Sequence, residues 1–171
     1  MRKLILVLLA VLAASAGAAA MNLKEAFDAL SHIPNINVRT ADYNLPVVAD
    51  VIKDGQISAA YNLDAALIKE SGDAAYTILN QVPLTYMING GNNNLAAAFV
   101  YATPNAEGTN DVLIAVMSGW RGAVVFIYGT IDNAARDAIQ QAPLEIEGPY
   151  LSIKTQMPDG SDFNIGISKG R

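Results

Sequence analysis

The sequence predicts an α+β domain with an antiparallel β-meander, helices packed on one face and a C-terminal β-hairpin. Three observations support this fold class. Residues 84–131 contain four apolar, β-rich segments joined by short polar turns, as in a meander. Segments on both sides of them carry apolar residues at helical spacing. Near the end, the strand-like runs 150–156 and 163–168 flank a Pro-Asp-Gly turn signal, which indicates the C-terminal hairpin.

A hairpin over residues 111–131 should lie at the centre of this fold. Two apolar runs flank a Gly-Trp-Arg-Gly reversal at 119–122, where glycine can adopt the positive φ angles of a tight turn. Both runs are apolar at consecutive positions, which is typical of strands covered on two faces. We expect the helices to cover one face. The other face, which carries Val125 and Ile127, should be covered by the C-terminal hairpin or by a second copy of the protein, and the hairpin is favoured because its runs carry alternate apolar residues.

The first twenty residues have the features of a secretory signal peptide. Arg2 and Lys3 precede an apolar run, and a series of small residues ends at Ala20. The apolar run is shorter than the ~20 residues that span a bilayer. We therefore expect cleavage after Ala20, a periplasmic or extracellular location and no stable membrane insertion. Residues 21–171 should form a single α+β domain, with 143–171 as a hairpin extension.

Composition excludes several classes of protein. The 171 residues are 52% hydrophobic and 16% charged, which is typical of one globular domain. The chain has no cysteine, so it forms no disulfide and has no cysteine for an N-terminal lipid anchor. The formal net charge is −5 and no basic run follows the leader, so a nucleic-acid partner is not expected.

A short helix should follow the leader. Asn22 is a good N-cap residue, Glu25 completes a capping-box pattern, and Pro34 marks the end of the segment. The apolar residues of this helix share one face: Leu23, Ala26, Phe27 and Leu30. Residues 36–40 alternate between apolar and polar types, which predicts a strand with one wet face.

Residues 47–53 leave two alternatives open. Apolar residues at helical spacing after Pro46 favour a helix that ends at Asp54 and Gly55. The alternative is a hairpin that turns at Asp54-Gly55. In both cases residues 57–63 should be extended.

Two further helices are predicted. Asp73 should cap a helix over residues 73–81, because Ser71-Gly72 punctuates the chain before it. Asp132 should cap a helix over residues 134–141. The connection that follows the last helix should be loose, because Pro143 and Gly148-Pro149 frame it.

Two short stretches are candidates for binding. Trp120 and Arg121 lie at the central reversal, and these two residue types concentrate binding energy at protein interfaces. The alternative is that Trp120 folds back over the edge of the sheet. Asn92, Asn93 and Asn94 belong to a predicted turn over 89–94, where they could contact a sugar. A plain β-turn is the alternative, because Asn and Gly tolerate left-handed backbone.

No catalytic residue, metal site or cofactor is predicted. His32 is the one histidine of the chain and has no second histidine or cysteine nearby. Asp111, Asp132 and Asp137 need not face one cleft, as paired catalytic carboxylates must. The oxygen-bearing residues within 159–164 lack the spacing of an EF-hand loop.

The order of elements, together with the Gly129-Thr130-Ile131-Asp132 corner, resembles small exported bacterial proteins classed as domains of unknown function. The resemblance covers about residues 23–140, and the hairpin after Pro149 departs from that pattern. It implies an exported α+β protein, with no activity and no functional residues to transfer.

These observations predict a non-catalytic binding or interaction module of the cell envelope. Its partner would be an unknown protein or glycan, and a monomer is favoured. One alternative is a hydrolase that acts on an envelope or dietary polymer, and another is a structural envelope subunit. A pocket with converging carboxylates, or with His32, would favour the hydrolase.

Overall fold

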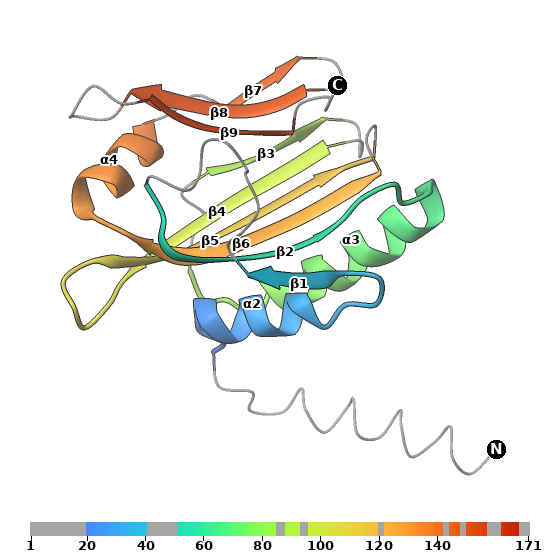
Figure 1. Ribbon diagram of the computed structural model, residues 1–171, viewed down its shortest axis with the longest axis horizontal. Coiled ribbons are helices and arrows are strands. Elements are labelled where there is room, and N and C mark those ends of the chain that lie inside the picture. Colours follow the sequence, from blue (N-terminus) through green and yellow to red (C-terminus); the bar gives the residue numbers. More distant parts are fainter. Residues whose placement is uncertain are drawn as a thin grey trace, which may run out of the picture.

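The computed structural model describes residues 20–40, 51–84, 88–92, 96–119, 122–141, 144–147, 150–156 and 162–167. The side chains of 37–40, 88–92, 96 and everything after 141 are not among those described. Within these ranges, helices and strands form an α+β fold with a six-stranded sheet and a three-stranded sheet (Figure 1). The predicted leader, residues 1–19, lies outside the described residues. So do residues 47–50 of the segment with two alternatives.

The six-stranded sheet is antiparallel and has the order β1-β2-β6-β5-β4-β3 (Figure 1). Its strands are β1 (Asn37–Thr40), β2 (Lys53–Ala60), β3 (Ile88–Asn92), β4 (Ala96–Pro104), β5 (Asn110–Ser118) and β6 (Ala123–Ile131). The strands β3 to β6 are neighbours both in the chain and in space, which confirms the predicted meander. The predicted central hairpin is β5–β6, paired from Asn110↔Ile131 to Ser118↔Ala123.

One face of this sheet is covered by α2 (Leu23–Ser31) and α3 (Ala65–Leu79), which lie side by side below it in Figure 1. The capping box of α2 is present, since Asn22 and Glu25 exchange side-chain to backbone hydrogen bonds. All four predicted apolar residues of α2 are buried: Leu23, Ala26, Phe27 and Leu30. They pack against sheet residues that include Val124 and Phe126.

The predicted start of α3 is wrong. Asp64 is the N-cap, and its Oδ1 accepts a hydrogen bond from the Leu67 amide at 2.9 Å. The helix then continues through Ser71 and Gly72 without a break. Ser71 is buried, and a Cβ on Gly72 would lie 3.6 Å from the sulfur of Met117. Small residues at these positions therefore let the helix cross close over β5, and this packing outweighs their low helix propensity.

Neither alternative for Asp54-Gly55 describes the structure. These residues are not a helix exit or a turn, because β2 runs through them. The pairing of β2 with β6 shifts register between Lys53 and Gln56, and Asp54 has a φ of 53°. This irregularity is a β-bulge, in which one extra residue fits into the strand. The predicted extended segment from Ile57 is confirmed as far as Ala60.

The second face of the sheet is covered by different elements. The helix α4 (Asn133–Gln141) buries Ala135 and Ile139 in the cluster that contains Ile114 and Ile127. This helix therefore lies opposite α2 and α3, whereas the prediction grouped all helices on one face. The direction of the chain decides this, because Ile131 at the end of β6 belongs to the second face and leads directly into α4.

The C-terminal strands are β7 (Leu144–Glu147), β8 (Tyr150–Gln156) and β9 (Asp162–Ile167). The hairpin β8–β9 confirms the prediction. The strand β7 lies where a loose connection was expected, and its pairing with β8 adds a third strand. Figure 1 places these strands on the side of the large sheet opposite α2, where β8 contacts α4 and β7 contacts β3. On that side Val125 and Ile127 are buried, as predicted.

The predicted turn over residues 89–94 is wrong for residues 89–92. Residues 89–92 belong to β3 and pair with β4, from Asn89↔Phe99 to Asn92↔Ala96. The connection between β3 and β4, residues 93–95, lies outside the described residues. Glycines at 90 and 91 suggested a turn, but they are compatible with an edge strand once β4 supplies hydrogen-bond partners. No helix in the described ranges is both long enough and apolar enough to cross a membrane.

Candidate functional site

The reversal between β5 and β6 is held in place at its base. Ser118 pairs with Ala123, and the Gly122 amide donates to the Gly119 carbonyl at 3.4 Å. The Leu63 amide donates to the Gly122 carbonyl at 2.9 Å, which ties the reversal to the segment leading into α3. The predicted contact residues Trp120 and Arg121 lie between these anchors and outside the described residues.

Gly122 is required by close packing against Leu63. Its φ is 57°, and a Cβ at this position would lie 2.3 Å from the Leu63 carbonyl oxygen and 2.8 Å from its nitrogen. Both atoms belong to the backbone and cannot move aside without disturbing the start of α3. The left-handed conformation predicted for this turn is therefore present at Gly122.

The strand register brings the two predicted binding stretches to the same end of the sheet. Asn92 is the last residue of β3, and its partner Ala96 also pairs with Ser118. Ser118 in turn pairs with Ala123 across the central hairpin. The ends of β3 and β4 that flank residues 93–95 and the ends of β5 and β6 that flank residues 119–122 therefore lie at the same end of the sheet, with neighbouring strands about 4.8 Å apart. Asn93, Asn94 and the side chain of Asn92 lie outside the described part.

We call this end of the sheet the hairpin end and define it by its described residues, Tyr61–Asp64, Asn92, Gly119 and Gly122. The segment after β2 reaches it because Ala60 pairs with Val124. Tyr61 is exposed there, with 46% of its surface accessible. No local sequence pattern marks Tyr61, since only the pairing of β2 with β6 places it beside the central reversal.

A polar network lies at the other end of the sheet, on the face of α2. The hydroxyl of Tyr128 hydrogen bonds with Asp111. Burial raises the pKa of Tyr128, and the negative charge of Asp111 adds to this effect. The carboxylate also accepts a hydrogen bond from Asn105 Nδ2 at 3.0 Å. With its pKa raised, Tyr128 acts as a hydrogen-bond donor at neutral pH and not as a base.

Lys24 extends this network to α2 and β2. Its ammonium lies 5.5 Å from the ring centroids of both Phe27 and Tyr128, which is within the range of a cation–π contact. It also pairs with Asp28 and donates to Gln56 Oε1 at 3.3 Å. These contacts join α2 to the strands β2 and β6, so they stabilise the packing of the helix on the sheet.

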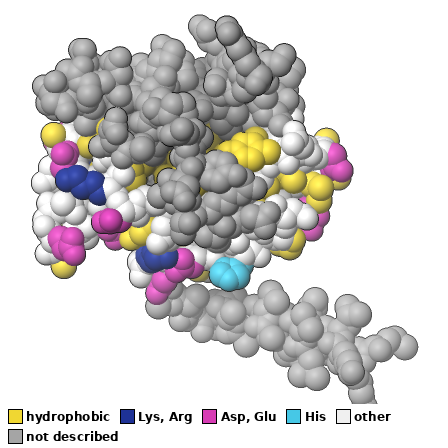
Figure 2. Space-filling view, in the orientation of Figure 1, with side chains coloured by type: hydrophobic (Ala, Val, Ile, Leu, Met, Phe, Trp, Pro, Cys, Tyr) yellow, Lys and Arg dark blue, Asp and Glu magenta, His cyan; other side chains and the backbone are white. Residues whose placement is uncertain are grey.

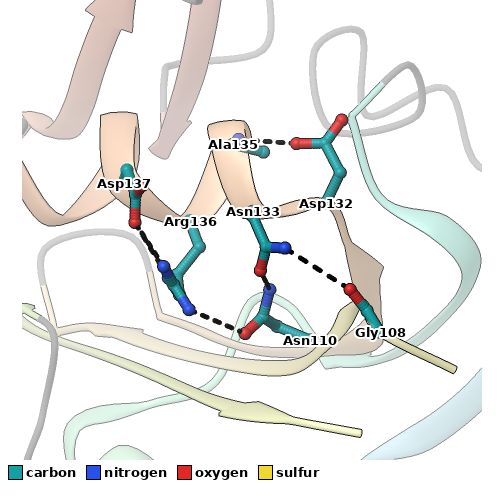
Figure 3. Close-up of polar contacts among 7 residues, drawn as sticks. All are labelled: Gly108, Asn110, Asp132, Asn133, Ala135, Arg136 and Asp137. Atoms are coloured by element: carbon teal, nitrogen blue, oxygen red, sulfur yellow. Dashed lines mark hydrogen bonds and ion pairs between the residues drawn. The ribbon is translucent and has the colours of Figure 1, made fainter. Parts of the chain in front are cut away.

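A second polar network fixes the corner between β5 and α4 (Figure 3). Asn110 is fully buried, and its Nδ2 donates to Asn133 Oδ1 at 2.9 Å. Its Oδ1 accepts from Arg136 Nη1 at 3.3 Å, while Asn133 Nδ2 donates to the Gly108 carbonyl at 3.4 Å. Both ends of the buried amide are satisfied, as the burial of a polar group requires.

The three carboxylates considered for catalysis have separate partners. Asp132 Oδ1 accepts from the Ala135 amide at 2.7 Å, which confirms it as the N-cap of α4 (Figure 3). Asp137 pairs with Arg136 at 2.7 Å. Asp111 is held by Asn105 and Tyr128 on the opposite face of the sheet. These three acids therefore do not converge.

His32 is exposed at the C-cap of α2, where its Nδ1 lies 2.6 Å from the Asp28 carbonyl. The histidine is visible at the surface in Figure 2, where basic side chains on the displayed face have acidic neighbours. Among the described residues, no three histidine, aspartate or glutamate side chains gather in a group that could hold a metal ion.

Comparisons with protein-family models, with characterised proteins and with solved structures found no match to this chain. The resemblance to exported domains of unknown function therefore stays a prediction.

Proposed function

We propose that this protein is an exported, non-catalytic binding or interaction module of the cell envelope, and that it contacts its protein or glycan partner through the hairpin end. This proposal rests on one observation, which is that three chain segments lie at the same end of the sheet. Register brings Ala60, Asn92 and Ser118 to that end, and Tyr61 and Gly119 directly follow Ala60 and Ser118 in the chain. The neighbouring positions carry Trp120, Arg121, Asn93 and Asn94.

The backbone of the hairpin end supports a binding role. The hydrogen bond from Leu63 and the close approach at Gly122 fix the base of the reversal whose sequence contains Trp120 and Arg121. A fixed base lowers the conformational entropy that is lost on binding. Aromatic and arginine side chains with asparagine nearby suit either a protein surface or the hydroxyl groups of a glycan.

The proposal is tested by sedimenting the purified chain with isolated cell-envelope fragments. Trp120→Ala and Arg121→Ala should each weaken binding at least about tenfold, as expected for residues that each contribute more than about 1.4 kcal/mol. Tyr76→Ala is a matched control, because Tyr76 is 54% exposed on α3. Equal binding by all variants, or no binding by the parent chain, would contradict the proposal.

Enzymatic treatment of the fragments identifies the class of partner. If binding survives protease treatment and is lost after muramidase digestion, the partner is a glycan. The reverse result indicates a protein. If the protein by itself releases sugar or peptide from envelope fragments that received no enzyme, this result would favour the hydrolase and refute the non-catalytic role.

A further inference from the structure

The start of α2 is attached to the end of α3 through the backbone of Met21. The Met21 nitrogen donates to the Gln81 carbonyl at 3.1 Å. The side chain of Met21 packs against the apolar cluster between the helices and the sheet. Ala20, one residue earlier, is exposed. The first residue after the predicted cleavage site is therefore the one whose nitrogen bonds to the fold.

We propose that cleavage after Ala20 creates an ammonium group at Met21 that docks on the Gln81 carbonyl and ties α2 to α3 more strongly than the uncut chain can. This inference rests on the export included in the proposed function. In the uncut chain the same nitrogen is a neutral amide. A hydrogen bond from a charged donor is roughly twice as strong as one between neutral groups.

The location of the acceptor favours a positive charge. Gln81 follows Asn80, the C-cap of α3, and its amide donates back to the Ile78 carbonyl. The Gln81 carbonyl thus lies at the helix end that carries partial negative charge. The last turn of α3 and residues 80–84 contain no charged side chain that could compete for the ammonium.

One interaction opposes the docked ammonium. The N-terminal end of α2 carries partial positive charge, which repels a cation placed beside it. Glu25 offsets this repulsion, because its carboxylate lies in the first turn and accepts from the Asn22 amide at 3.0 Å. The other charged groups of α2 near this end are Lys24 and Asp28, which pair with each other. Because this repulsion is offset, the direct hydrogen bond to the Gln81 carbonyl makes the net effect of the docked ammonium stabilising.

Three chains test the proposal by thermal unfolding at pH 6.5 and pH 9.5. One starts at Met21 with a free amine, the second has that amine acetylated, and the third starts at Ala20. The buried hydrophobic core begins at Leu23, so each chain keeps it. At pH 6.5 the free-amine chain should unfold at a higher temperature than the other two. The ammonium in the Ala20 chain is displaced by about one residue, or 3.8 Å.

The advantage should disappear at pH 9.5. An N-terminal ammonium has an ordinary pKa of about 8, and docking on a carbonyl should raise the pKa of the Met21 amine. The stabilisation is therefore complete below about pH 8 and is lost as the pH rises through the raised pKa. The other polar and charged groups on the α2 side of the sheet, such as Asp111 and Tyr128, are common to all three chains and cancel in the comparison.

An NMR titration of the Met21 amine gives a second measurement. A pKa above that of an unfolded peptide supports docking, and a pKa at or below it overturns the proposal. Equal unfolding temperatures for the free and acetylated chains at pH 6.5 would also overturn it. Sequencing the N-terminus of the exported protein tests cleavage separately, so failure of export and failure of docking give different results.

Discussion

Single glycines have opposite effects in this fold, depending on what lies next to their Cα atoms. At Gly129 a Cβ would come 2.3 Å from Ile52 Cγ2 and 2.8 Å from the Lys53 carbonyl oxygen. At Gly72 the nearest atom would be Met117 Sδ, at an ordinary contact distance of 3.6 Å. The residue type alone does not distinguish the two positions, since the contacts come from other elements.

These distances predict opposite effects for the same substitution. Gly129→Ala should destabilise the fold by about 1–3 kcal/mol, because β2 with its bulge must move away from β6. Gly72→Ala should stabilise it by about 0.5–1 kcal/mol, because alanine restricts the unfolded chain and favours a helix. Urea unfolding at equilibrium measures both values. A stable Gly129→Ala variant would show that the bulge does not press against this glycine.

The tyrosine at the α2 face has a predictable alkaline response. The folded state raises the pKa of Tyr128 through burial and through Asp111, so unfolding favours loss of its proton. Stability should therefore fall as the pH rises above about 10, the ordinary tyrosine value. Tyr128→Phe removes this group and should make the decline above pH 10 less steep. Melting temperatures of the parent chain and of Tyr128→Phe between pH 8 and 11 test this prediction. An equal decline in the two chains would show that Tyr128 does not cause it.

At the scale of elements, the start of α3 shows where local patterns mislead. Asp73 has the residue type of an N-cap and follows Ser71-Gly72, yet it lies inside the helix and pairs with Lys69 on the surface. Asp64, which is the actual N-cap, does not differ from Asp73 in residue type. Two aspartates satisfy the same local rule, and the close crossing of α3 over β5 selects the longer helix.

Mutation of the two aspartates tests the corrected helix start. Asp64→Ala should cost about 0.5–2 kcal/mol, because the Leu67 amide loses its acceptor. Asp73→Ala should cost no more than about 0.5 kcal/mol, since its ion pair with Lys69 is exposed. Asp132→Ala provides a reference cap, with a predicted cost of about 1 kcal/mol for α4. Chemical denaturation measures all three, and a larger effect at Asp73 than at Asp64 would contradict this helix start.

At the scale of the whole molecule, the large sheet is buried on two sides by unlike layers. The helices α2 and α3 cover one side, and α4 lies on the other together with the strands β7, β8 and β9 (Figure 1). Full burial of an aliphatic side chain contributes about 1.5–3 kcal/mol. Loss of a cover from the side of Val125 and Ile127 should therefore have a large effect.

A chain that ends at residue 143 lacks β7–β9 and tests this arrangement. It should aggregate or dimerise, because the side of the sheet that carries Val125 and Ile127 would lose the three strands that lie on that side in Figure 1, while the full mature chain should stay monomeric. A chain that ends at residue 167 retains the three strands and serves as the control. Size-exclusion chromatography with light scattering measures the oligomeric state of both chains. A monomeric, stable chain ending at 143 would show that these strands do not protect the sheet.

Local sequence determined much of this protein. The capping box of α2, the cap of α4, the central hairpin and the C-terminal hairpin were all predictable, because each depends on residues within a few positions of one another. Consecutive apolar residues in β5 and β6 also indicated a sheet buried on both faces. Such patterns reflect the geometry of one helix or one pair of strands, which neighbouring residues encode.

Contacts between distant segments decided the rest. Pairing of β2 with β6 produced the bulge at Asp54 and brought Tyr61 to the hairpin end. Packing over β5 carried α3 through Gly72, and the exit of β6 placed α4 on the second face. The networks around Asn110 and Tyr128 join residues that are far apart in the chain. No local pattern specifies these features, because their energies arise only when separate elements meet in the folded state.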